Sequence, residues 1–238
     1  MNKIAIFVEG LTEQLFIEKL LSEIAGAKNI HIEKRQARGG AKSKRTLISI
    51  EYANLDEARR YYAQIVDCSN DSKVASDIRD QYDSLIKEGY QAIIGIRDVY
   101  PAQYTDIPKL RRSMANYMKT KPITVSLILA VMEIEAWFIA EYTHFPKLHE
   151  MLTLQKIKDE VGIDPSMDNI EQFPHPADDL QKIYQIAGLY YQKKKSHIEL
   201  TIGKLDYASM YLNHRTLFKD FADFGKLINE IETFLACD

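Results

Sequence analysis

The chain has 238 residues, of which 46% are hydrophobic and 27% are charged. This composition is typical of a folded globular protein and excludes a disordered chain. The formal net charge is −3, which excludes a strongly basic nucleic-acid-binding protein, so any affinity for phosphate must come from a local patch. The two cysteines, Cys68 and Cys237, are far apart, and no apolar run approaches the ~20 residues of a membrane span. We therefore expect a soluble protein of a reducing cytoplasm.

An apolar run near the start of the chain predicts the first strand. Residues 4–8 are all apolar, which is typical of a strand covered on both faces in a parallel sheet. The run ends at Glu9, and the following Gly10 and Thr12 allow a tight turn and a helix start. Apolar side chains then recur on one helix face, at Phe16, Leu20 and Ile24. The sequence therefore opens with a strand, a turn and a helix.

The segment between residues 29 and 87 carries weaker signals. Residues 29–34 favour a second strand, and a basic loop is expected to follow it over residues 35–45. Residues 54–66 and 74–87 both predict helices. These helices would connect the first strands to those that come later in the chain.

Two later strands are strongly apolar and end in acidic residues. Residues 91–97 form the first of them, which ends at Asp98. Residues 123–132 form the second, which ends in Glu133-Ile134-Glu135 and leads directly into a helix. Beyond about residue 143 only helices are predicted. Because strands that alternate with helices indicate a parallel sheet, we expect an α/β fold of Rossmann-like type over residues 1–142, with a C-terminal helical extension over residues 143–238 packed on it.

The acidic residues at the strand ends point to a metal site. Glu9, Asp98 and the pair Glu133 and Glu135 each follow an apolar strand, and the carboxyl ends of parallel strands meet at one edge of a sheet. Carboxylates that converge repel one another, and a hard divalent cation offsets this cost. The pattern predicts a Mg²⁺ or Mn²⁺ site. The alternative is that these acids are simply exposed residues at strand ends.

The same residues resemble a known family. Residues 4–13, Ile-Ala-Ile-Phe-Val-Glu-Gly-Leu-Thr-Glu, resemble the first motif of TOPRIM domains, the topoisomerase–primase fold. The version of overcoming-lysogenization-defect nucleases and related small phage-defence proteins is the most similar. The second motif of the family is Asp-x-Asp, and here it reads Asp98-Val99-Tyr100, so a tyrosine replaces the second aspartate. Residues 133–138 resemble the Ile-Glu-Ala-Trp segment of small bacterial TOPRIM-like proteins.

The resemblance implies a TOPRIM-like, magnesium-dependent nuclease with a role in phage defence. Glu9, Asp98 and Glu135 would be the catalytic residues, with Glu133 and Glu13 as further metal ligands. For Glu13 a first-turn glutamate that complements the helix dipole is an equal alternative. The tyrosine in the second motif favours a second hypothesis, a catalytically silent TOPRIM-like subunit that binds nucleic acid or a partner ATPase. A homo-oligomer is also compatible with the sequence.

Basic residues supply the expected contacts with nucleic acid. The loop over residues 35–45 has two glycines that let the backbone approach a ligand closely, and it carries no acid. A second basic patch lies near the C-terminal third of the chain. The predicted contacts are Arg35, Arg38, Lys42, Lys44 and Arg45 in the loop and Lys193 and Lys194 in the second patch. Charge runs of this kind also occur as solvated surface, which is the alternative for both segments.

Overall fold

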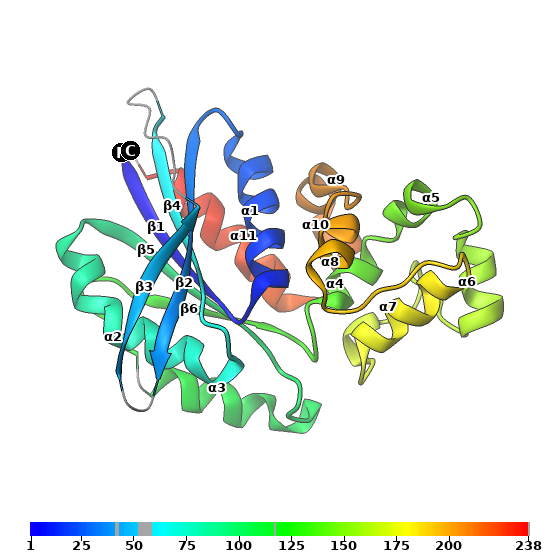
Figure 1. Cartoon of the computed structure of the whole chain (residues 1–238), viewed down its shortest axis with the longest axis horizontal. Coiled ribbons are helices and arrows are strands. Elements are labelled where there is room, and N and C mark those ends of the chain that lie inside the picture. Colours follow the sequence, from blue (N-terminus) through cyan, green and yellow to red (C-terminus); the bar gives the residue numbers. More distant parts are fainter. Residues whose placement is uncertain (41–42, 52–58, 117, 238) are drawn as a thin grey trace. The chain divides into compact units, whose positions relative to one another are not determined.

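The computed structural model describes residues 1–40, 43–51, 59–116 and 118–237 (Figure 1). Its strands are β1 (Asn2–Val8), β2 (Ile30–Gly40), β3 (Ser43–Glu51), β4 (Tyr61–Asp67), β5 (Tyr90–Asp98) and β6 (Val125–Ala130). Its α-helices are α1 (Leu11–Ala25), α2 (Val74–Lys87), α3 (Ile107–Ala115), α4 (Glu135–Ala140), α5 (Phe145–Leu148), α6 (Leu154–Val161), α7 (Pro176–Gln185), α8 (Lys195–Ile202), α9 (Tyr207–Leu212), α10 (His214–Leu217) and α11 (Ala222–Leu235).

The strands form one sheet in the order β3-β2-β4-β1-β5-β6. β1 pairs in parallel with both β4 and β5, and β2 pairs in parallel with β4, whereas the edge strand β3 is antiparallel to β2. The fold is therefore α/β, with a mostly parallel sheet flanked by helices and a C-terminal helix. This confirms the fold class predicted from the alternation of strands and helices.

The described chain divides into two compact units. The first unit comprises residues 1–97, 108–129 and 226–238, and the second comprises residues 98–107 and 130–225. Each unit is thus assembled from separate stretches of the chain. The division into domains of residues 1–142 and 143–238 stays a prediction.

The core of the first unit is built on β1, whose residues from Ile4 to Val8 are fully buried. Alternate residues of a strand point to opposite faces of the sheet. Ala5 and Phe7 belong to a cluster that includes the apolar face of α2, with Val74 and Ile78 among its members. Helices α1 and α11 lie on the other side of the sheet (Figure 1). The central strand is therefore covered on both faces, as its unbroken apolar sequence predicts.

Gly95 shows how closely α2 packs on the sheet. A Cβ atom at this position of β5 would lie 2.7 Å from Ile78 Cδ1 and 3.3 Å from Val74 Cγ1. Both atoms belong to the buried face of α2. A side chain at position 95 would force the Ile78 side chain to move, which explains a glycine inside an otherwise apolar strand.

The second unit consists mainly of helices joined by irregular segments. A buried polar network connects some of these helices. Glu141 and His144 are fully buried, and the His144 ring lies 3.3 Å from a Glu141 carboxylate oxygen. Tyr184 of α7 contacts His144 Nε2 at 3.3 Å and donates a hydrogen bond of 3.0 Å to Thr201 of α8. Among the described helices, none is long and apolar enough to cross a membrane.

Two sequence-based assignments are wrong. The helix expected over residues 54–66 is replaced, in its described part, by strand β4, all of whose residues are buried. The loop expected over residues 35–45 is mostly strand, because β2 extends to Gly40 and β3 begins at Ser43. Pairing with neighbouring strands overrides the local signal in both segments. The helix predicted over residues 74–87 is confirmed as α2.

A candidate metal centre

Three carboxylates converge in the second unit. Asp98 is the last residue of β5, Glu133 follows β6, and Glu135 is the first residue of α4. Each offers an oxygen atom that lies within 4.8 Å of those of the other two. All three side chains are buried, and Glu135 is fully so. We call Asp98, Glu133 and Glu135 the acidic triad.

A sharp turn after β6 precedes Glu133 and Glu135, the two glutamates of the triad. Met132 has a φ of 59°, a left-handed conformation that residues other than glycine seldom adopt. The Glu133 N–H then bonds back to the Val131 carbonyl at 3.0 Å, and α4 begins two residues later. Strained backbone of this kind persists where the surrounding structure holds it, and it is often found at functional sites.

One oxygen of each carboxylate is held by a neutral donor. The Ile134 N–H donates to Asp98 Oδ1 at 3.1 Å, and the Ala177 N–H at the start of α7 donates to Glu133 Oε2 at 3.0 Å. The Tyr191 hydroxyl donates to Glu135 Oε1 at 2.7 Å. These three bonds fix the orientation of the carboxylates.

The second oxygens all face the ammonium group of Lys193. Lys193 Nζ lies 3.3 Å from Glu133 Oε1, 3.7 Å from Glu135 Oε2 and 3.8 Å from Asp98 Oδ2. The Lys193 side chain is 48% exposed, whereas the carboxylates it contacts are almost completely covered. One flexible cation therefore occupies the point on which the three acids converge.

The electrostatics of the triad favour a cation of higher charge. Burial raises the pKa of Glu135, and the neighbouring Glu133 raises it further, against the opposing effects of Lys193 and the Tyr191 hydrogen bond. Glu135 Oε2 makes no hydrogen bond to any residue that the structure describes. Oxygen ligands from one or two carboxylates plus water suit Mg²⁺, and a divalent ion offsets the repulsion among the acids better than a single ammonium. The donor set thus fits a hard divalent metal.

The sequence of the chain places it among related proteins. Residues 8–222 match the model of a family described as a domain of unknown function, DUF4276. The chain belongs to this family. No curated protein and no solved structure matches the chain. All three residues of the acidic triad lie inside the region that matches the DUF4276 model.

Glu9 and Glu13 belong to the first unit of the DUF4276 chain. Glu9 directly follows β1 and is half-buried. Glu13 is buried in the first turn of α1, where its Oε2 atom accepts a hydrogen bond of 2.9 Å from the Gly10 N–H. Its place in the first turn is that of the alternative, a glutamate that complements the helix dipole, and the hydrogen bond to Gly10 adds a contact at the helix start. The roles of both residues as metal ligands stay predictions.

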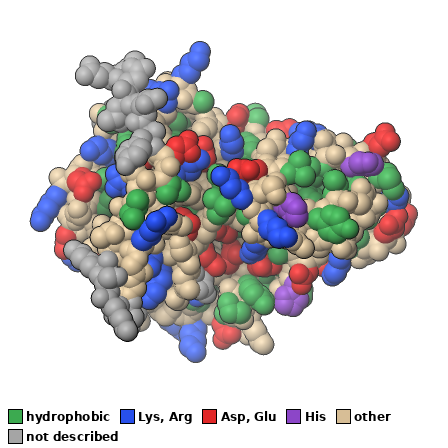
Figure 2. All heavy atoms as spheres, in the orientation of Figure 1, with side chains coloured by type: hydrophobic (Ala, Val, Ile, Leu, Met, Phe, Trp, Pro, Cys, Tyr) green, Lys and Arg blue, Asp and Glu red, His purple; other side chains and the backbone are tan. Residues whose placement is uncertain are grey.

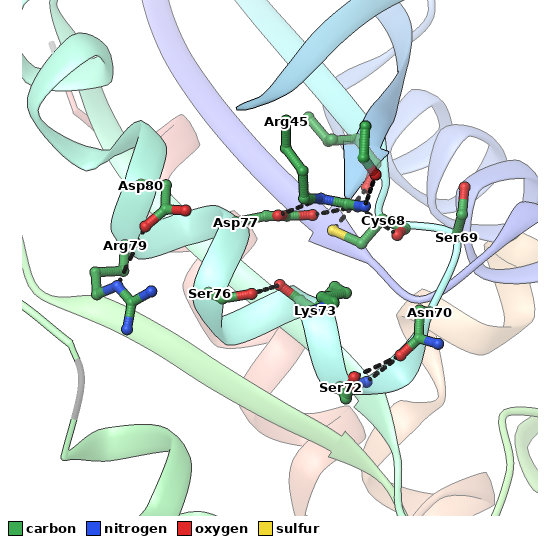
Figure 3. Close-up of polar contacts among 12 residues, drawn as sticks. Arg45, Cys68, Ser69, Asn70, Ser72, Lys73, Ser76, Asp77, Arg79 and Asp80 are labelled. Atoms are coloured by element: carbon green, nitrogen blue, oxygen red, sulfur yellow. Dashed lines mark hydrogen bonds and ion pairs between the residues drawn. The ribbon is translucent and has the colours of Figure 1, made fainter. Parts of the chain in front are cut away.

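Two of the predicted phosphate-binding arginines make ion pairs inside the first unit. Arg45 contacts both oxygens of the buried Asp77, at 2.7 and 2.8 Å, and donates to the Cys68 carbonyl at 2.8 Å (Figure 3). Arg35 contacts both oxygens of Glu33, at 2.8 and 3.1 Å. Their guanidinium groups are thus held by carboxylates of the same unit. These pairs favour a structural role for Arg35 and Arg45.

The remaining basic residues have different surroundings. Arg38 is exposed and donates to the Gln36 side chain at 3.0 Å, and Lys194 is exposed just before α8. Lys44 lies in strand β3, whereas Lys42 is outside the described residues. On the face of the molecule in Figure 2, basic and acidic side chains are interspersed. Nucleic-acid contacts by these residues stay predictions.

The sequence did not reveal the partners of the triad. Lys193 was interpreted as part of a basic patch for nucleic acid, whereas the structure places its ammonium among three acids. Tyr191 was not singled out, and nothing in its local sequence indicates a bond to a glutamate 56 residues earlier. Asp67, the buried acid at the end of β4, was missed because that strand was interpreted as a helix.

Proposed function

We propose that this DUF4276 chain is a metal-dependent nuclease of TOPRIM type, in which the acidic triad holds Mg²⁺ or Mn²⁺. The observation that carries the proposal is that the two oxygens of each carboxylate have different partners. One oxygen is fixed by a donor of the protein, and the other faces a point shared by all three acids. The TOPRIM resemblance supports the reaction type, and the defence role follows from that resemblance.

Different residues of the chain would have different roles in phosphodiester hydrolysis. A bound divalent cation supplies Lewis-acid chemistry, by which water is activated and charge on the phosphate is offset. Asp98 and Glu135 would hold the cation, and Glu133 would add a third oxygen. Glu9 is proposed as the general base or metal-associated acid, by analogy with the glutamate that follows the first strand in TOPRIM domains.

Lys193 is proposed to change partners during the cycle. Its long side chain is half exposed, so the ammonium can leave the carboxylates when a divalent ion binds to them. An ammonium beside the triad is then available to a phosphate oxygen, since lysine binds phosphates as a point charge. Lys193 would thus hold the acids together before metal binding and contact the substrate afterwards.

A second candidate function is a silent subunit that binds nucleic acid or a partner ATPase. The observation that favours it is Tyr100, which stands where the TOPRIM pattern has its second aspartate. A tyrosine offers no carboxylate oxygen, and Tyr100 is 44% exposed and packs against the His175 ring. In the nuclease hypothesis Glu133 supplies the missing charge. Metal binding without hydrolysis of any substrate would favour the silent subunit.

The test is cleavage by the purified full chain. Labelled plasmid, single-stranded DNA and RNA are incubated in Mg²⁺ and, separately, in Mn²⁺. Asp98→Asn and Glu135→Gln keep the shape of the side chains and remove their charge, and Glu9→Gln tests the proposed base. Glu150→Gln, at an exposed position of the second unit, is the matched control.

The nuclease hypothesis predicts metal-dependent cleavage by the wild type and the control, with a loss of at least about 100-fold in the two triad variants. Cleavage that persists in both triad variants would place the active site elsewhere. Cleavage lost in the triad variants and kept in Glu9→Gln would remove Glu9 from the mechanism and leave the metal centre intact.

A further inference from the structure

A pocket of about 550 Å³ opens beside the acidic triad. It is lined by residues of the second unit, chiefly by Glu133, Asp178, Gln181, Gln185, Gln192 and Lys193, and we call it the α7 pocket. Its volume lies within the roughly 300–1,000 Å³ of pockets that take small-molecule ligands. Glu133 and Lys193 connect the pocket directly to the proposed metal centre.

The wall of the α7 pocket is made mainly of amide side chains, with one carboxylate. Asp178, Gln181 and Gln185 are three and four residues apart on α7, so they lie on one face of the helix. Gln192 joins them from the segment after α7. Gln181 Oε1 accepts a hydrogen bond of 2.6 Å from the Tyr191 N–H, which ties this wall to the residue that holds Glu135.

The two ends of the pocket suit different chemical groups. Next to Glu133 and Lys193, a cation and an ammonium would bind a phosphate. Along α7, each glutamine amide offers both donors and an acceptor, and Asp178 adds a further acceptor. Nucleobases present the same mixture of donors and acceptors on their edges, and glutamine and aspartate are among the side chains that read them. A nucleotide matches both ends of the pocket at once.

A double-stranded polymer fits the α7 pocket poorly. In a duplex, the base edges that pair with the opposite strand are already occupied. Proteins also generally contact a phosphate backbone with several arginines or lysines. The pocket carries one lysine against two acids, Glu133 and Asp178. It therefore repels a bare phosphate chain and favours a single phosphate whose charge is offset by a metal.

We propose that the α7 pocket takes one unpaired nucleotide of the substrate, with the phosphate at the triad and the base against Gln185 and Gln192. The inference rests on the proposed function, because the phosphate is held through the metal of the triad. It names the substrate class of that site, which is a nucleic acid with unpaired residues or a nucleotide end.

The test is calorimetric titration of the full chain with 5′-AMP and 5′-CMP, with and without Mn²⁺, and with adenosine and inorganic phosphate as probes that carry only one half of the ligand. The variant is Gln185→Leu combined with Gln192→Leu, both at exposed positions. Gln181 is left unchanged because its carbonyl oxygen holds Tyr191. Gln155→Leu on α6 is the matched control. Mn²⁺ binding is titrated separately for every protein.

We expect a 5′-nucleotide to bind in the presence of Mn²⁺ more tightly than adenosine or phosphate. The double variant should lose about tenfold in nucleotide affinity for two lost hydrogen bonds and keep its Mn²⁺ affinity. Equal nucleotide affinity in the double variant and the wild type, or phosphate binding as tight as that of nucleotides, would overturn the inference. Failure of the wild type to bind Mn²⁺ would contradict the proposed function instead. In that case, a nucleotide that binds the wild type and not the double variant would still support the pocket.

Discussion

In the first unit, two buried carboxylates each face an arginine of their own, whereas in the second unit three buried carboxylates face the same lysine. The Asp77–Arg45 and Glu33–Arg35 pairs have two short contacts each, between 2.7 and 3.1 Å. The contacts of Lys193 with the triad are longer, between 3.3 and 3.8 Å. Both sites place buried carboxylates against a basic side chain, so the difference lies in the cation, in how many carboxylates share it and in how closely it approaches them.

The difference separates charges that serve the fold from charges kept for a ligand. A planar guanidinium matches a carboxylate in two parallel bonds, and such a pair is complete in itself. A single ammonium shared by three carboxylates leaves most of the repulsion among them in place. The first arrangement needs nothing further, whereas the second becomes more stable when a divalent cation binds.

The largest effect is expected where a complete pair is broken. Asp77→Asn leaves the largely covered Arg45 without its carboxylate, which should lower the free energy of unfolding by about 3 kcal/mol. Glu135→Gln, measured in a chelator, should instead raise it by about 1 kcal/mol, because a buried charge next to Glu133 is removed and the Tyr191 hydroxyl can still donate to the amide oxygen. Urea unfolding of the two variants and the wild type measures both. If the free energy of unfolding fell in both variants or rose in both, the distinction between the two kinds of site would be contradicted.

Metal should stabilise the second unit and leave the ion pairs of the first unchanged. Mn²⁺ at about 100 times its dissociation constant is expected to stabilise the wild type by about 2.7 kcal/mol. Asp98→Asn should abolish this gain, and Asp77→Asn should keep it. Unfolding curves with Mn²⁺ and with a chelator supply the comparison. A gain that survives in Asp98→Asn would place the binding site outside the triad.

Removing Lys193 should make the triad a stronger metal site. Lys193→Ala takes away a cation that competes for the three carboxylates, so the Mn²⁺ affinity should rise by roughly tenfold, or about 1.4 kcal/mol. Cleavage by this variant should fall, because the ammonium proposed to contact phosphate is gone. Lys195→Ala is the matched control two residues away, where the lysine pairs with the exposed Glu199. Weaker Mn²⁺ binding by Lys193→Ala would show that the lysine supports the site.

The Glu33–Arg35 pair in β2 should make the stability of the fold depend on pH in the acidic range. Burial raises the pKa of Glu33, but hydrogen bonds from Arg35, Ser49 and Tyr62 outweigh it, so the pKa lies below the ordinary value of 4.5. A lowered pKa stabilises the fold above pH 4.5, and this contribution is lost as the pH falls through the pKa of the folded state.

Unfolding at a series of pH values below 6 compares the wild type with Glu33→Gln. The wild type should lose stability on acidification more steeply than the variant, and Glu51→Gln, at an exposed position of β3, should behave like the wild type. Parallel curves for the wild type and Glu33→Gln would show that the Glu33 network contributes nothing to acid stability.

The sequence predicted the elements whose periodicity is strong. The apolar run of β1 and the amphipathic pattern of α2 are local signals, and the structure has both elements where they were expected. β4 was missed because its residues Tyr61–Asp67 gain strand structure from β1 and β2 on either side, which no local pattern records. The long strand β2 was cut short because its basic residues resemble a loop.

The sequence predicted the three acids of the candidate site as strand-end residues but not how they are held. Asp98 ends an apolar strand and Glu133 follows another, which is a readable pattern. The donors from Ala177 and Tyr191 come from residues 44 and 56 positions later in the chain, and their contacts depend on tertiary packing. For the same reason the sequence did not indicate the ion pair between Arg45 and Asp77.

The central claim is that the triad is a divalent metal site, and Mn²⁺ binding followed by electron paramagnetic resonance tests it most directly. The account predicts saturable binding to the full chain that is lost in Asp98→Asn and Glu135→Gln and kept in Asp77→Asn and Glu150→Gln. Binding of equal affinity in all of these proteins, or no binding by the wild type, would contradict it.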